Sequence, residues 1–114
     1  MEKNSVLSVS PSREKLIVRH TALRDAGMNV TSVLTIAEAR FEIQMGRCGN
    51  LLICHDLSPV QADDIAKLFR KYCPAGRIVF VTDGSGHASA TPEADAYIPE
   101  ASGPQELVQA LRAA

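Results

Sequence analysis

The chain has 114 residues, of which 46% are apolar and 22% charged, values typical of one soluble globular domain. We therefore expect a single domain over residues 1–114. The 12 Lys and Arg residues nearly balance the 13 Asp and Glu residues, which argues against nucleic-acid binding through a basic surface. No apolar run approaches the roughly 20 residues of a membrane span, and the first residues do not match a signal peptide. These features predict a cytoplasmic protein.

The three cysteines are Cys48, Cys54 and Cys73. An odd number of cysteines without an export signal predicts reduced thiols. Their spacing matches no zinc motif. Cys54, His55 and Asp56 place three possible ligands in a row, but neighbours in a strand point to opposite faces and are not expected to reach one ion. We therefore expect no metal site from these residues.

The first half of the chain predicts three strands separated by two helices. Residues 6–9 predict the first strand and residues 13–26 a helix. The stripe of that helix that faces the core is expected to contain Leu16, Ile17, His20 and Leu23. A second strand over 29–34 precedes a capping box at 35–38, which opens a helix that runs to about residue 45. The uninterrupted apolar run at 51–54 is typical of a strand buried on both faces, as in a parallel sheet.

The second half continues this alternation but contains one unusual segment. Ser58-Pro59 combines an N-cap with a proline at the first helical position. The helix that it opens has an apolar stripe of Ile65, Leu68, Phe69 and Tyr72. A buried strand is predicted over 77–82. Residues 83–92 carry no large apolar side chain, so we expect a loop there rather than a full helix. A short strand over 96–98 and a helix opened by Gly103-Pro104 complete the series.

Strands that alternate with helices predict an α/β fold with a parallel sheet covered on both faces. The spacing fits a flavodoxin-like three-layer sandwich with strand order 2-1-3-4-5, in which the fourth helix is shortened or missing. In such a sheet, ligands bind beyond the carboxyl ends of the strands. The segments expected there are Ser10–Ser12, His55–Ser58, Thr82–Gly84 and Pro99–Ala101.

Five segments, in order along nearly the whole chain, resemble the receiver domain of two-component response regulators. They are Val6–Ser12, Ala26–Val30, Asn50–His55 followed by Pro59, Ile78–Thr82 and Ala94–Ile98. The resemblance implies phosphorelay signal transduction with protein partners of a bacterial-type pathway. It implies neither a nucleic-acid nor a membrane partner, and it leaves a homodimer open.

The residues that carry receiver chemistry are mostly absent from this sequence. Two acidic residues hold Mg²⁺ after the first strand in the family, but the matching positions here are Ser10 and Pro11. The phosphoacceptor position, four residues before a proline, is His55 rather than Asp. The lysine that follows the fifth strand is replaced by Glu100. The switch hydroxyl after the fourth strand is retained as Thr82.

Two further positions have more than one interpretation. Tyr97 matches the aromatic residue that accompanies Thr82 in the family's switch, but it also fits a tyrosine at the edge of the core. Asp83 either faces the degenerate pocket or begins an Asp83-Gly84 turn.

These departures predict a stand-alone degenerate receiver, or pseudo-receiver. It would act through protein–protein interaction, with no enzymatic activity, no catalytic residues and no cofactor. The alternative is a phosphorylatable receiver that binds Mg²⁺ and uses Asp56 as acceptor, for which the strand is expected to slip by one residue. His55 could also act as a phosphohistidine or general base. A small α/β enzyme or nucleotide-binding protein is a third option, but the sequence lacks G-x-G-x-x-G, P-loop and G-x-S-x-G motifs.

Overall fold

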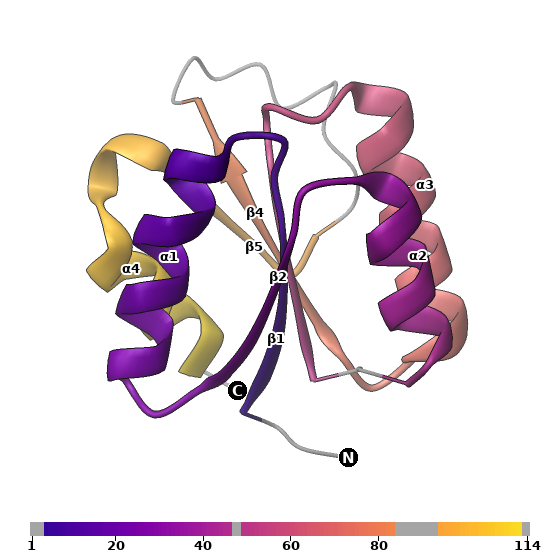
Figure 1. Ribbon diagram of the computed structural model, residues 1–114, viewed down its shortest axis with the longest axis horizontal. Helices are drawn as coiled ribbons and strands as arrows, with labels where there is room; N and C mark the ends of the chain where they lie inside the picture. The colour runs from indigo at the N-terminus through magenta and orange to yellow at the C-terminus, as the bar shows by residue number, and fades with distance from the viewer. Residues whose placement is uncertain (1–3, 47–48, 84–93, 113–114) are drawn as a thin grey trace.

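The computed structural model of the chain describes residues 4–46, 49–83 and 94–112 (Figure 1). The strands are β1 (Ser5–Val9), β2 (Asn29–Val33), β3 (Asn50–Cys54), β4 (Arg77–Thr82) and β5 (Ala96–Pro99). The helices are α1 (Arg13–Asp25), α2 (Ile36–Gln44), α3 (Pro59–Tyr72) and α4 (Pro104–Arg112), with a short 3₁₀ turn, η2 (Glu100–Ser102), before α4.

The five strands form one parallel sheet in the order β2-β1-β3-β4-β5. Helices α1 and α4 cover one face of the sheet, and α2 and α3 cover the other (Figure 1). This arrangement confirms the predicted flavodoxin-like sandwich. Because all strands run the same way, their carboxyl ends meet at one edge of the sheet, where α1, α3 and η2 also begin.

The core lies in two layers because both faces of the sheet are covered. Every residue of β3 is buried, as the uninterrupted apolar run predicts. Ile65 and Phe69 of α3 pack in the layer beneath α2 and α3. Leu23 of α1 and Leu107 of α4 pack in the other layer. The central strands are therefore held from both sides, which fixes the position of the edge at which they end.

Side-chain caps set the start of α3 where the sequence places it. The Ser58 hydroxyl accepts a hydrogen bond from the Gln61 backbone N–H at 3.2 Å, and the Gln61 side chain accepts one from the Ser58 N–H at 3.4 Å. This reciprocal pair satisfies two N–H groups that have no partner within the helix.

Two details of the predicted helix faces are wrong. Ile17 and Tyr72 are exposed, although both were expected to face the core. The buried stripe of α1 instead passes through Leu16, Arg19 and Leu23, because the steps of three and four residues that define one helix face leave Ile17 off it. In α3, the helix ends at Tyr72 and the next residue, Cys73, is buried instead.

The cysteine prediction is correct for one residue and wrong for another. Cys54 carries a free, buried thiol, whereas Cys73 is disulfide-bonded. An odd number of cysteines is compatible with one disulfide, so the count alone could not establish that all the thiols are reduced. Cys48 lies outside the described residues.

The segment in which the fourth helix was expected to be shortened or missing, residues 84–93, also lies outside the described residues. Within the part of the chain that the structure covers, no helix is both long and apolar enough to span a bilayer.

Candidate functional site

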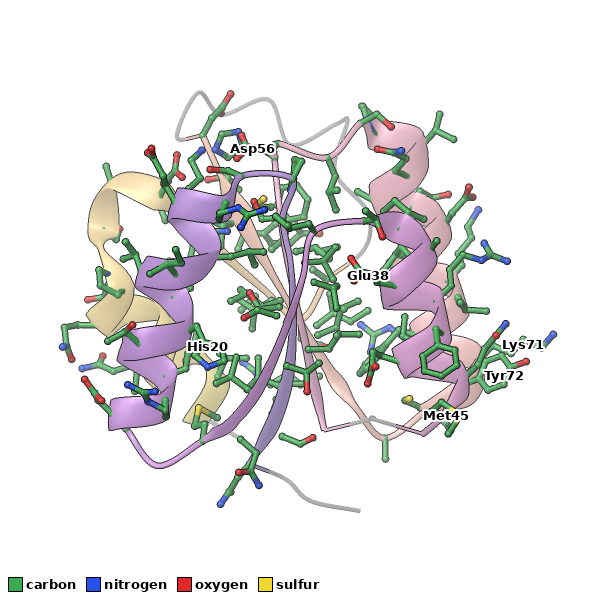
Figure 2. All side chains as sticks on the ribbon, viewed as in Figure 1. His20, Glu38, Met45, Asp56, Lys71 and Tyr72 are labelled. Carbon is green, nitrogen blue, oxygen red and sulfur yellow. The ribbon has the colours of Figure 1, made fainter. Side chains whose placement is uncertain are left out.

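A cluster of charged side chains lies at the carboxyl edge of the sheet. His55 and Asp56 follow β3, and Glu100 follows β5. Lys15 and Arg19 reach the same place from the first turns of α1. Figure 2 shows Asp56 at this end of the sheet, beside the amino end of α1. We call these five residues the edge cluster.

Lys15 is the centre of the edge cluster. Its Nζ lies 2.8 Å from Oδ2 of Asp56 and 2.9 Å from Oε2 of Glu100. Hydrogen bonds to Asp56 and Glu100 raise the pKa of Lys15. The hydrogen bond from Lys15 is also the main reason that the pKa of Glu100 is lowered, with a further contribution from His55, although burial opposes it. One ammonium group therefore neutralises carboxylates from two different loops.

The His55 ring lies between the two carboxylates, and each ring nitrogen faces one of them. Nε2 is 3.0 Å from Oε1 of Glu100, and Nδ1 is 3.4 Å from Oδ1 of Asp56. The His55 backbone N–H donates to the carbonyl of Val81 at 3.0 Å, which anchors the residue to β4. These contacts and the two ion pairs of Lys15 thus close a ring through Lys15, Asp56, His55 and Glu100.

His55 and Asp56 reach this ring together without a change of strand register. β3 ends at Cys54, and the next two residues lie in a turn rather than in the strand. The alternation of a strand, which would send neighbouring side chains to opposite faces, therefore does not apply to them. The expectation that Asp56 needs a one-residue slip to enter the site is wrong for this reason.

Arg19 is a member of the edge cluster that the sequence did not reveal. It is buried to a relative exposure of 5%, and its Nη2 lies 3.4 Å from Oε2 of Glu100. The signal that could have found it is its spacing, one helical turn from both Lys15 and Leu23 on the sheet-facing side of α1.

Ser10 and Pro11, at the positions where the resemblance implies an acidic pair, differ in burial. Ser10 is buried, its N–H donates to the Val33 carbonyl at 3.2 Å, and its hydroxyl accepts from the Ser12 N–H at 3.1 Å. Pro11 is exposed. Ser10 therefore shapes the turn into α1, and neither residue supplies a carboxylate to the edge cluster.

The candidate switch residues lie on the neighbouring strands. Thr82 is half-buried at the end of β4, and the following Asp83 is exposed. Tyr97 of β5 is also exposed, its ring centroid lies 6.2 Å from that of Phe80, and its hydroxyl accepts from the Ala94 N–H at 3.0 Å. The structure thus places Tyr97 outward at the sheet edge, and a switch role for it stays a prediction.

The edge cluster is a poor fit to Mg²⁺, the ion that an active receiver requires. Mg²⁺ prefers near-octahedral oxygen ligands that include one or two carboxylates. The carboxylates of Asp56 and Glu100 already share the Lys15 ammonium, so a cation there would be repelled as well as attracted. Among the described residues, no group of three or more His, Cys, Asp or Glu is placed to hold a metal ion.

Solved structures with the same fold include several receiver domains. The chain aligns with a CheY-like response regulator receiver domain from Methanospirillum hungatei JF-1 at 19% identity and a TM-score of 0.75, over 95% of this chain and 90% of the other. It aligns with a chemotaxis response regulator of Vibrio cholerae at 18% identity and a TM-score of 0.79, over 95% of both chains.

A third similar structure is a putative pilus assembly-related protein from Burkholderia pseudomallei K96243. Here the identity is 16% and the TM-score 0.74, over 99% of this chain and 91% of the other. No protein-family model matches the chain, and no curated protein does. Agreement across almost the full length of each structure at these identities establishes the architecture: the chain has the fold of CheY-like response regulator receiver domains.

Proposed function

We propose that this chain is a degenerate receiver domain that transmits signals through protein–protein contacts, without Mg²⁺-dependent phosphorylation of an aspartate. One observation carries the proposal. The Lys15 ammonium lies within 2.9 Å of both carboxylates of the edge cluster, at the edge where a receiver binds its metal and phosphoryl group. The cluster is already neutralised by side chains of the same chain.

Charge placement supports this proposal from a second direction. Phosphoryl transfer relies on cations that neutralise the oxygens of the transferred group. At the position where the resemblance implies a lysine, this chain has Glu100, which lies 3.0 Å from the His55 ring. A phosphoryl group on His55 would therefore face a carboxylate, and Lys15 could stabilise it only by leaving Asp56 or Glu100.

A role in protein contacts agrees with the outer surface of α2. Phe41 and Met45 are both strongly exposed and lie one helical turn apart. Single exposed apolar residues are ordinary, whereas adjacent ones favour a contact surface. We propose protein partners in a bacterial-type cytoplasmic signalling pathway, a second copy of the chain among them, and no enzymatic activity.

The second candidate function is a receiver that is phosphorylated on Asp56. The observation in its favour is that Asp56 enters the edge cluster directly and lies 2.8 Å from Lys15. An ammonium at that distance could stabilise an acyl phosphate once Mg²⁺ had been bound. Glu100 shares Lys15 with Asp56 and would repel the phosphorylated product.

Incubation with acetyl phosphate and Mg²⁺, followed by intact-mass measurement, tests the proposal. We expect the mass of the unmodified chain, while an active receiver domain treated in parallel gains a phosphoryl group. A phosphoryl adduct that disappears in Asp56→Asn but persists in His55→Asn would overturn the proposal and establish the second candidate. An adduct with the opposite dependence would assign phosphohistidine chemistry to His55.

A further inference from the structure

We propose that the cavity between α1 and α4 binds a small amphipathic anion, with a carboxylate or phosphate head group on a compact apolar body. The cavity has a volume of about 270 Å³ and lies beside the edge cluster. The inference goes beyond the proposed signalling function and does not depend on it.

The buried guanidinium of Arg19 is the first reason. Arg19 lines the cavity and is 5% exposed. Among the described residues, its Nη1 has no hydrogen-bond partner, and its Nη2 has only the long 3.4 Å contact to Glu100. A guanidinium is best satisfied by two parallel hydrogen bonds to one oxyanion. A buried cation that lacks half of this arrangement favours an oxyanion ligand.

Glu100 cannot complete that arrangement itself. Its Oε1 lies 3.0 Å from His55, and its Oε2 lies 2.9 Å from Lys15. Both oxygens are therefore committed to shorter contacts than the one to Arg19. An external oxyanion that moves Glu100 aside could bind the Arg19 guanidinium and could also contact Lys15, which lines the same cavity.

The start of α4 adds a third favourable element. Gly103 and Pro104 line the cavity, and α4 begins at Pro104. Pro104 has no N–H, but the N–H groups of the next residues in a first helical turn lack partners within the helix, and the helix dipole places partial positive charge there. An anion held by Arg19 would therefore also lie near the positive end of α4.

The remaining walls define the other part of the ligand. Of these, Val18 of α1, Val81 of β4, Pro99 of β5 and Leu107 of α4 are apolar, and Glu14 in the first turn of α1 is acidic. A fully hydrated ion such as inorganic phosphate would leave the apolar surface uncovered, whereas an aromatic or short aliphatic group would bury it. The walls thus favour an organic anion over an inorganic one.

Glu100 competes with the ligand for the two cations, Lys15 and Arg19. It lies in the short turn η2, and the following Gly103 has a φ of 83°, a conformation that glycine adopts easily. Ligand binding would exchange one anion for another at Lys15 and Arg19. The ligand would therefore release Glu100, and with it one contact of His55 in the edge cluster.

Titration of the ¹⁵N-labelled chain, followed by amide chemical shifts at low salt, tests the proposal. The probes are phenyl phosphate and benzoate, with inorganic phosphate to test the apolar body and benzyl alcohol to test the charged head. We expect saturable shifts around Arg19, Gly103 and Leu107 with both organic anions, and weaker binding of the other two probes. Glu100→Gln should bind the organic anions several-fold more tightly, because it removes the competing charge.

Substitutions on α1 provide the matched controls. Arg19→Met should weaken binding roughly tenfold or more, as expected for loss of a charged hydrogen bond, while Arg19→Lys keeps the charge and should lose less. Arg24→Met, an exposed arginine on the same helix, should leave binding unchanged. Unfolding curves show whether Arg19→Met is folded, and Arg19→Lys carries the test if it is not.

Three results would overturn the inference. One is the absence of saturable shifts with either organic anion. The second is equal binding by the wild type and both Arg19 variants, and the third is binding of benzyl alcohol as tight as that of the anions. None of these results affects the phosphorylation test, because that test measures covalent modification of His55 or Asp56.

Discussion

Replacing Lys15 by methionine should lower the free energy of unfolding by about 1–2 kcal/mol, because the ammonium holds two loops together. The substitution keeps most of the length and apolar surface of the side chain. It removes the contacts at 2.8 Å to Asp56 and 2.9 Å to Glu100. It also leaves the two carboxylates at one edge of the sheet with less compensating charge.

The magnitude follows from the distances and the exposure of the groups. Two unit charges 2.9 Å apart attract by roughly 1.4 kcal/mol at the dielectric constant of water. The three side chains are 32%, 22% and 36% exposed, so solvent screens them and part of the attraction is offset by lost side-chain entropy. About 0.5–1 kcal/mol for each contact is a reasonable net value. For a domain of this size, the sum corresponds to a fall in Tm of about 5–10 °C.

Urea titrations at neutral pH measure this loss, with Lys67→Met as the matched control. Lys67 forms an equally short pair, 2.9 Å from Asp63, but its side chain is 76% exposed. The control should therefore change stability much less. In a Glu100→Gln background, Lys15→Met should cost less than in the wild type, because one of its partners has been neutralised.

Two outcomes would refute this reasoning. If Lys15→Met is as stable as the wild type or more so, the cost of desolvating the three charges equals or exceeds their attraction. If the loss is the same in the Glu100→Gln background, Lys15 stabilises the fold through packing rather than through the ion pairs. A loss that disappears at about 1 M salt would agree with the proposed electrostatic origin.

Three further predictions concern Glu100, Asp95 and Ser58. The hydrogen bond from Lys15 holds the pKa of Glu100 below its usual 4.5. The stability gained from the Glu100 carboxylate is therefore present above pH 4.5 and is lost as the pH falls through the lowered pKa. Glu100→Gln should flatten that part of a profile of unfolding free energy against pH. The pKa of Asp95 is lowered overall: burial raises it, but hydrogen bonds from the Ile78 N–H at 2.7 Å and from Arg70 at 3.1 Å outweigh that effect. Asp95→Ala should therefore cost roughly 1–2 kcal/mol in urea titrations at neutral pH and less in acid. Ser58→Ala should lower the free energy of unfolding by about 1 kcal/mol, measured by thermal unfolding. Ser58→Gly should lower it by only about 0.3 kcal/mol, because glycine is tolerated at an N-cap.

The fold was predictable because its signals are local and agree with one another. The apolar run of residues 51–54 predicts a strand buried on both faces, and β3 is fully buried. The Ser58-Pro59 pair predicts the start of α3, which begins at Pro59. Such signals depend on side-chain size and backbone preference, which are properties of each segment by itself. Right-handed crossovers then leave few possible sheet orders, and the spacing of the five strands fits the order 2-1-3-4-5.

The edge cluster was predictable only in part because it depends on how helices dock. The positions of His55 and Glu100 follow from the ends of β3 and β5. The contributions of Lys15 and Arg19 depend on the rotation of α1 about its axis, and a cation on a helix is more often solvated than directed at a sheet edge. Asp56 was expected to need a one-residue slip because the alternation of side chains along a strand was taken to continue two residues beyond the end of β3.

The balance of charge at the edge cluster connects the proposed function with the proposed anion site. Lys15 and Arg19 supply two positive charges, and Asp56 and Glu100 supply two negative ones. Adding Mg²⁺ or a phosphoryl group to this set would leave charge uncompensated at a site that water reaches only in part, which is costly. Exchanging Glu100 for an external anion keeps the sum unchanged. The same neutrality that opposes receiver phosphorylation therefore permits ligand exchange. The Glu100 carboxylate would repel a phosphoryl group, whereas the binding of an external anion would release that carboxylate from Lys15 and Arg19.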